Sequence, residues 1–163
     1  QHLLGLSVSA NLKGAVASRQ REQMLARLNE NHLSAAIEVD ELDSAGKGSA
    51  VFISSASMPS YFGFSGLGVK GKPAERVADE AINQLLTFLE SGAALDRYLA
   101  DQVLIPLSVA SENSQFRIET VSKHFVTNVE IIRKFLDVSI EFVRSNNGSA
   151  RVDIEPASTL SWA

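Results

Sequence analysis

His124 is the residue whose type and position best suit covalent chemistry in this sequence. It lies in the run Ser122–Asn128, between a strand-like segment and an amphipathic helical segment. The amino terminus of a helix favours anions and disfavours an extra proton on a nearby imidazole. A neutral imidazole there could attack a phosphorus atom while the helix end receives the phosphate oxygens. Histidines at helix starts are also commonly caps or packed side chains, so spacing alone leaves both interpretations open.

The other histidines and the absence of cysteine narrow the chemistry further. We expect His2, near the chain end, and His32, in an asparagine-rich turn, to be surface residues. The sequence has no cysteine, which excludes disulfides, thiolate metal sites and cysteine nucleophiles. We identify no metal-ligand motif in the sequence, and His124 is the main candidate nucleophile.

A second candidate cluster combines an aromatic ring, a carboxylate and an amide at helical spacing. Tyr98, Asp101 and Gln102 stand at i, i+3 and i+4, so a helix would place them on one face. Such a face can stack a base and form hydrogen bonds with a sugar or a base edge. The same spacing is typical of a solvated helix face with a half-buried tyrosine, and spacing alone favours that simpler interpretation.

A glycine-rich segment matches one nucleotide-binding pattern only in part. Gly66–Gly71 fits GxGxxG, and Lys72 follows it. A dinucleotide fold needs an acidic residue at the end of the next strand, about 20 residues on, but those positions here fall at the end of a helix. A P-loop needs Ser or Thr after the lysine, where this sequence has Pro73. We therefore favour a flexible loop, with Lys70 and Lys72 solvated near a helix start, over a nucleotide-binding loop.

Two successive sets of elements would position these residues. In the first set we expect strands at 3–9, 34–42 and 51–53, helices at 15–30 and 73–91, and a loop at 57–72. The strands at 34–42 and 51–53 are predicted to form a hairpin. In the second set we expect a helix at 96–110 bent at Pro106, a strand at 115–121, a helix at 124–136 and a hairpin of strands 138–144 and 150–155. The tail after Pro156 is expected to fray.

This order of elements predicts a mixed α+β or α/β fold in which helices are layered on sheets. Ser91 and Gly92 separate the two sets. We therefore expect one compact domain at residues 1–93 and a second domain part at 94–163.

Composition sets outer bounds on function. The 163 residues are 45% hydrophobic and 21% charged, which is close to globular averages and argues against disorder. The net charge of -4 argues mildly against RNA binding through backbone electrostatics. No apolar run approaches the length of a membrane span, and no signal segment opens the chain. Residue 1 is Gln rather than an initiator Met, so we expect a fragment whose earlier part is missing.

Several short motifs follow one another along the chain: Gly71–Ala78, Ser91–Ala94, Tyr98–Gln102 with Ile105–Leu107, His124–Asn128, and Phe135 with Leu136. In this order they resemble the RNA 3'-terminal phosphate cyclase family. The ordered match covers about residues 66–155. The first 60 residues resemble the small inserted domain of that family more loosely.

The resemblance implies an ATP-dependent, ligase-type nucleotidyl transferase that converts an RNA 3'-phosphate to a 2',3'-cyclic phosphate. The family histidine, which would carry AMP covalently, falls on His124. The stretch that contacts ATP in the family falls on Tyr98, Leu99, Ala100, Asp101 and Gln102. The resemblance also implies a divalent metal, Mg or Mn, with ligands outside this chain. The absence of cysteine is compatible with the cytoplasmic location that we expect. The implied partners are RNA 3'-phosphate ends, ATP and the missing amino-terminal half of the same protein, without a membrane.

The resemblance further implies that residues 1–93 form the small α/β insert and that 94–163 form the last β-α-β-β unit of a larger repeated-unit catalytic domain. Lys123 departs from the family pattern, where a small residue is expected, and Phe125-Val126 stands where Leu-Leu is more usual. The fragment alone is expected to be inactive. The alternatives are a non-catalytic relative, similar to ribosome-assembly proteins that lack the histidine, and an α/β interaction domain. The presence of His124 favours the enzyme.

Overall fold

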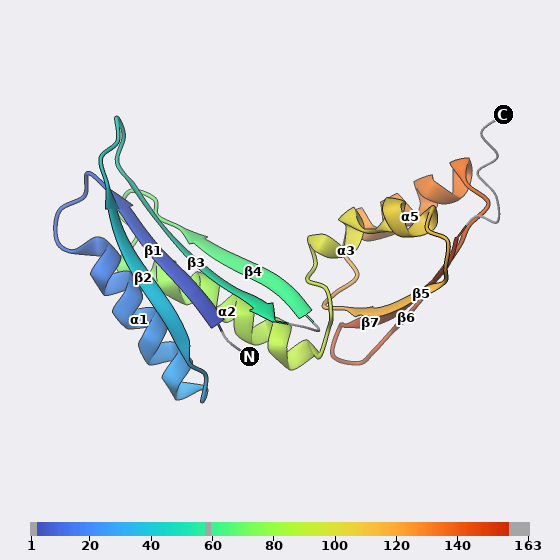
Figure 1. Ribbon diagram of the computed structural model, residues 1–163, viewed down its shortest axis with the longest axis horizontal. Coiled ribbons are helices and arrows are strands. Elements are labelled where there is room, and N and C mark those ends of the chain that lie inside the picture. Colours follow the sequence, from blue (N-terminus) through green and yellow to red (C-terminus); the bar gives the residue numbers. More distant parts are fainter. Residues whose placement is uncertain (1–2, 58–59, 157–163) are drawn as a thin grey trace. The chain divides into compact units, whose positions relative to one another are not determined.

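The computed structural model describes residues 3–57 and 60–156, which form two units divided between Thr87 and Phe88. The first unit contains β1 (Leu3–Ala10), α1 (Val16–Glu30), β2 (Ala35–Leu42), β3 (Gly48–Ser57), β4 (Ser60–Leu67) and most of α2 (Ala74–Ser91). The second contains α3 (Leu99–Gln102), α4 (Leu104–Ser108), β5 (Ser114–Ile118), α5 (Lys123–Phe135), β6 (Ser139–Arg144) and β7 (Ala150–Glu155). Helices pack on sheets in both units, so the predicted α+β class is confirmed (Figure 1).

The sheet of the amino-terminal unit has the strand order β2-β1-β3-β4. β1 pairs in parallel with β2 and antiparallel with β3. The predicted hairpin between residues 34–42 and 51–53 is therefore wrong. The connection through α1 brings β2 alongside β1 in the same direction, as βαβ crossovers do, and β3 then pairs with the other edge of β1.

The predicted loop at 57–72 is also wrong over much of its length, because β4 occupies residues 60–67 and pairs antiparallel with β3. Phe62 and Phe64 are buried on the helix-covered face of the sheet, with Gly63 between them. Serine and glycine in this strand weaken its alternating pattern, which explains why sequence reasoning missed it.

The core of the amino-terminal unit lies between this sheet and the two helices α1 and α2, which cover the same face of it (Figure 1). The sheet and both helices contribute large buried side chains: Met24, Leu28, Ile53, Ile82 and Leu85. A Cβ atom on Gly66 would stand 2.1 Å from the carbonyl oxygen of Val77, so only glycine lets α2 approach β4 this closely. The spacing of apolar residues correctly predicted both helices.

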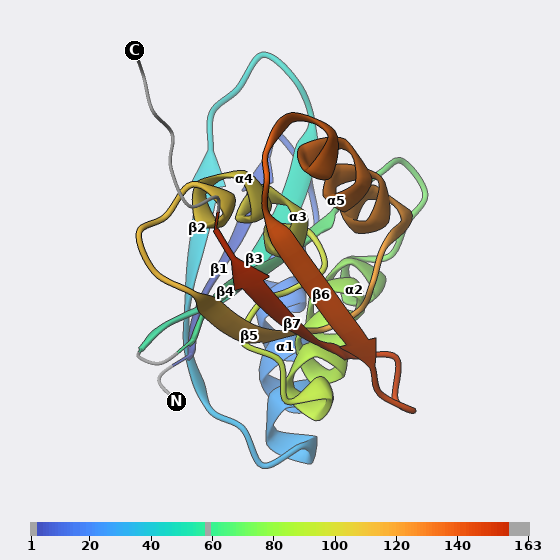
Figure 2. The ribbon, with the colours of Figure 1, turned by 90° about the vertical axis from the view of Figure 1, so that its right-hand side faces the viewer.

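The sheet of the carboxy-terminal unit has the order β5-β7-β6, and both pairings are antiparallel. Figure 2 shows α3, α4 and α5 gathered on one side of these strands. Their buried residues share one core, made of Ala100, Leu104, Phe125, Val129 and Ile132 from the helices and Ile118, Ile140, Val152 and Ile154 from the strands. Within residues 3–57 and 60–156, no helix combines the length and the apolar character that a membrane crossing requires.

The helix predicted at 96–110 is instead two short helices, α3 and α4, that meet at Val103. The break falls before Pro106, the residue at which we predicted a bend. Pro106 is the third residue of α4, where its missing N–H leaves no intrahelical hydrogen bond unmade. The predicted tail after Pro156 lies outside the described residues.

Candidate active site around His124

His124 is the second residue of α5, and its side chain is exposed. Ser122 caps the helix by accepting a hydrogen bond of 3.0 Å from the amide of Phe125 at its side-chain oxygen. Phe125 and Val129 point into the core, because helical spacing turns that stripe toward the strands. His124 therefore lies at the accessible start of a firmly capped helix and is not part of the core.

The start of α5 provides a favourable electrostatic setting for phosphate. No acidic residue occupies the first turn, and Lys123 precedes the histidine. The helix dipole places partial positive charge at this end, where free amide groups can receive anionic oxygens. An exposed imidazole beside such a site can act as a nucleophile toward phosphorus when it is neutral.

The stretch Tyr98–Gln102 occupies α3 and the residue before it. Tyr98 is 62% exposed, Gln102 is exposed and Asp101 is half-buried. These three side chains remain available to a ligand. Ala100 is fully buried in the core, and Leu99 is half-buried, so the side chain of Ala100 contributes packing and only its backbone could meet a nucleotide.

Two carboxylates that sequence reasoning did not single out fix the start of α3. Asp96 accepts hydrogen bonds at one oxygen from the amides of Tyr98 (2.7 Å) and Leu99 (2.8 Å). An Asp just before a helix is a known capping signal, so this role could have been predicted from sequence. The second anchor, Glu119, lies 22 residues from its partner Arg97, and no local pattern could have shown that pairing.

Among the described residues of this unit, Glu119 and Arg97 form the closest ion pair. The guanidinium donates to Glu119 Oε1 at 2.6 Å, and the Arg97 backbone amide donates to Oε2 at 3.2 Å. The hydrogen bond to Glu119 raises the pKa of Arg97 above its usual value. The Glu119 side chain is 4% exposed, whereas that of Arg97 is 43% exposed. A buried carboxylate thus holds the chain immediately before Tyr98.

The fold brings the two predicted clusters onto neighbouring helices, since α3 packs against α5 on the same side of the sheet (Figure 2).

His32 is exposed in a turn with a left-handed backbone (φ 57°), in agreement with a surface role. His2 lies outside the described residues. Among residues 3–57 and 60–156, no group of three or more His, Asp or Glu side chains could hold a metal ion.

The glycine-rich segment Gly66–Gly71 lies in the other unit, where it begins at the end of β4 and continues into the connection to α2. Lys72 is not solvated as predicted. Its ammonium group pairs with Glu80 at 2.8 Å and donates to the carbonyl oxygen of Leu67. Gly71 adopts φ +87°, a conformation that side chains disfavour, so the turn itself requires this glycine.

Residues 1–90 match the sequence family described as "RNA 3'-terminal phosphate cyclase (RTC), insert domain". Similar proteins include the RNA 3'-terminal phosphate cyclases of Methylococcus capsulatus and Methanosarcina mazei. The first is 35% identical over 159 residues, covering 96% of this chain and 44% of that protein. The second is 32% identical over 154 residues, covering 94% of this chain and 42% of that protein.

A third similar protein, the RNA 3'-terminal phosphate cyclase of Ectopseudomonas mendocina, is 44% identical over 91 residues. That match covers 56% of this chain and 26% of the relative. The chain thus spans less than half the length of these relatives. The similarity extends over both units for the first two proteins and is therefore not confined to the insert.

Proposed function

Because the chain belongs to the RNA 3'-terminal phosphate cyclase family, we propose that it supplies the carboxy-terminal half of an ATP-dependent enzyme that cyclises RNA 3'-phosphate ends. In this proposal, residues 1–93 are the insert domain and residues 94–163 are the last part of the catalytic domain. The remaining part belongs to the amino-terminal half of the same protein.

The proposed reaction has three steps. A lone pair of the neutral His124 imidazole attacks the α-phosphorus of ATP, a P–N bond forms, and pyrophosphate leaves with the electrons of the broken P–O bond. An oxygen of the RNA 3'-phosphate then attacks the same phosphorus, and the imidazole leaves. Finally, the 2'-hydroxyl oxygen attacks the adenylated 3'-phosphorus, loses its proton and expels AMP, which closes the 2',3'-cyclic phosphate.

The residues of this chain have separate tasks in that sequence. Tyr98 would stack on the adenine, while Asp101 and Gln102 would form hydrogen bonds with the nucleoside. The start of α5 would receive phosphate oxygens beside His124. The family implies a divalent metal, which would neutralise triphosphate charge. The described residues include no group of three or more candidate acidic or histidine ligands, so we assign no step of this chain to a metal.

One observation carries the proposal. The only histidine at a helix start in the described residues is exposed, and it lies on a capped helix against which α3 packs. A packed or structural histidine would be buried or held by partners. The alternative is a non-catalytic cyclase-like protein that acts in ribosome assembly or as an interaction domain. The fold alone fits either function, so the discriminating evidence must be chemical.

A cyclisation assay with the full-length protein tests the proposal. A single-stranded RNA labelled at its 3'-phosphate is incubated with ATP, and resistance of the label to phosphatase reports the cyclic product. We expect ATP-dependent resistance with the wild type and none with His124→Ala. Label that stays fully sensitive with a folded wild type would favour the non-catalytic alternative. We expect the 163-residue chain alone to be inactive.

A further inference from the structure

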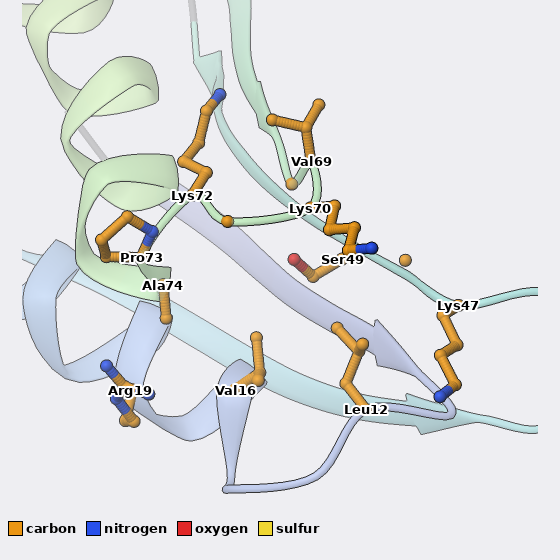
Figure 3. A pocket seen from close by; sticks show the side chains of 13 residues that line it. Leu12, Val16, Arg19, Lys47, Ser49, Val69, Lys70, Lys72, Pro73 and Ala74 are labelled. Atoms are coloured by element: carbon orange, nitrogen blue, oxygen red, sulfur yellow. The ribbon is translucent and has the colours of Figure 1, made fainter.

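A pocket of about 590 Å³ lies at one end of the amino-terminal unit (Figure 3). Three connections enclose it: the segment between β1 and α1, the turn before β3, and the segment between β4 and α2. Its volume is in the range of pockets that hold small ligands or one nucleotide. The proposed chemistry at His124 makes no use of it.

The charged side chains that line this pocket are all cations: Arg19, Lys47, Lys70 and Lys72. Within residues 3–57 and 60–156, no Asp or Glu lines it, although the whole chain carries a net charge of -4. Cations gathered in an otherwise acidic protein mark a place where negative charge is attracted. The pocket therefore selects for an anionic ligand.

Two of the four cations are free to meet such a ligand. Arg19 and Lys72 are paired with α2 carboxylates, at 2.7 Å and 2.8 Å respectively. Lys47 and Lys70 have no hydrogen bond or ion pair with any other residue in the described part of the chain. Figure 3 shows that their side chains come from two different connections. These two ammonium groups are the available anchors for phosphate.

The rest of the lining is largely apolar. Leu12, Val16, Val69 and Pro73 line the pocket, and Val69 is 62% exposed and Leu12 37% exposed. Exposed apolar side chains inside a cationic rim suit a ligand with both a flat apolar part and a negative charge. A nucleotide has this combination, since its base has a π-face and its phosphate is anionic.

The pocket is pre-formed, and two of the backbone amides around it already donate within the chain. The Asn11 side chain donates to the carbonyl oxygens of Ser44 and Gly46, which ties two of the connections together. In the glycine-rich segment, the amide of Gly68 donates to Ser49 O at 2.8 Å and that of Lys72 to Val69 O at 3.0 Å. A P-loop instead turns such amides toward phosphates. These two amides are not available to a ligand phosphate, and the side chains of Lys47 and Lys70 are the charged anchors that the pocket offers.

We propose that this pocket binds one nucleotide of a single-stranded RNA, with the base on the apolar lining and a backbone phosphate held by Lys47 and Lys70. The choice of RNA rests on the proposed function. The site is separate from the one that carries His124, and it would hold the strand by contacts that do not depend on its 3'-phosphate. It gives the insert domain a role in holding the substrate RNA.

Fluorescence anisotropy with the full-length protein tests this site. The probe is a labelled single-stranded RNA with a 3'-hydroxyl end, which cannot react and lacks the phosphate that the proposed active site recognises. Each single-strand phosphate that the protein neutralises adds about 0.7 to the slope of log affinity against log salt. Lys47→Ala/Lys70→Ala removes both cations from one phosphate, so we expect the slope to fall by about 0.7 and the affinity to fall roughly fivefold at 0.1 M salt.

The matched control is Lys134→Ala/Arg144→Ala, which removes the same charge from exposed residues of the carboxy-terminal unit. We expect the control to retain the wild-type slope. Equal losses in both double variants, or an unchanged slope in the pocket variant, would overturn the proposal.

Labelling of the wild type by ATP, which needs no RNA, reports separately on the proposed function. If ATP labels the wild type but the salt slope is the same in Lys47→Ala/Lys70→Ala, this inference is refuted and the proposed function stands. If ATP does not label the wild type but the salt slope falls in Lys47→Ala/Lys70→Ala, this site is supported and the proposed mechanism is refuted.

Discussion

Tyr98 presents its ring to solvent although tyrosine is usually at least half-buried, and 62% of it is exposed. Such a ring is ready to stack on a base. We predict that Tyr98→Ala in the full-length protein weakens ATP binding by about 1–3 kcal/mol, or roughly 5- to 150-fold, without loss of folding. Tyr98→Phe keeps the ring and should bind ATP nearly as well. Calorimetric titration with ATP measures both, and an unchanged affinity of the alanine variant would remove Tyr98 from the site.

At the scale of single residues, the local sequence pattern predicted where a residue lies in a helix better than it predicted the partners and the burial of its side chain. The amphipathic spacing after Ser122 correctly set the start of α5, and with it the exposed His124. The ion pair between Glu119 and Arg97 could not be predicted, because it joins segments 22 residues apart. The burial of Ala100 was equally hidden, since it depends on how α3 packs on the core.

Among the elements, α3 has only four residues and cannot be stable through its own hydrogen bonds. The buried carboxylate of Glu119 holds the chain that leads into it. We predict that Glu119→Gln lowers stability by about 1–2 kcal/mol, because charge-assisted hydrogen bonds become neutral ones. The amide of Ala100, which donates to Asp96 O at 3.0 Å, should exchange its hydrogen faster.

Hydrogen exchange followed by mass spectrometry, together with urea unfolding, measures these effects. The matched control is Asp153→Asn, which neutralises the exposed pair with Arg151 on β7. Exposed pairs contribute little, so the control should leave both exchange and stability nearly unchanged. Equal changes in hydrogen exchange and in stability in the two variants would show that Glu119 does not stabilise α3 more than an exposed ion pair would.

The contact between α1 and α2 has a predictable pH dependence. The pKa of Glu75 is lowered, first by its own backbone amide and then by the side chain of Arg19. A carboxyl whose pKa is lowered by folding adds stability above its unfolded pKa and loses it as pH falls through the folded value. We predict that Glu75→Gln lowers stability near neutral pH by less than about 1 kcal/mol, because the pair is exposed. The difference in urea midpoint should shrink as the pH falls through the lowered pKa of Glu75, and a difference that persisted below it would contradict this assignment.

Helices were easier to predict from the sequence than strands and their partners. The apolar stripes of α1, α2 and α5 have the period of a helix and give their limits to within a residue or two. β4 was missed because glycine and serine interrupt its alternation. The pairing of β2 with β1 could not be read from the neighbouring turn, since it depends on the crossover through α1.

At the scale of the whole molecule, the chain is less than half of the relatives that it resembles. Its net charge of -4 suggested little affinity for RNA, yet four cations of the amino-terminal unit line one pocket. A total charge cannot reveal such a distribution, because residues as distant in sequence as Arg19 and Lys70 meet only in the fold. The ordered motifs did identify the family. Each motif alone fits several kinds of protein, whereas several motifs in one fixed order along the chain are specific to a family.

The most direct test of the central claim is the mass of the His124 peptide after incubation of the full-length protein with ATP. We predict one added adenylyl group on His124 through a P–N bond, which is lost in acid and stable in base. His124→Ala and His124→Asn should remain unmodified while folding as the wild type does, because the side chain is exposed and leaves no core cavity. An adenylyl group on another residue, or labelling that persists in a folded His124→Ala protein, would contradict the account.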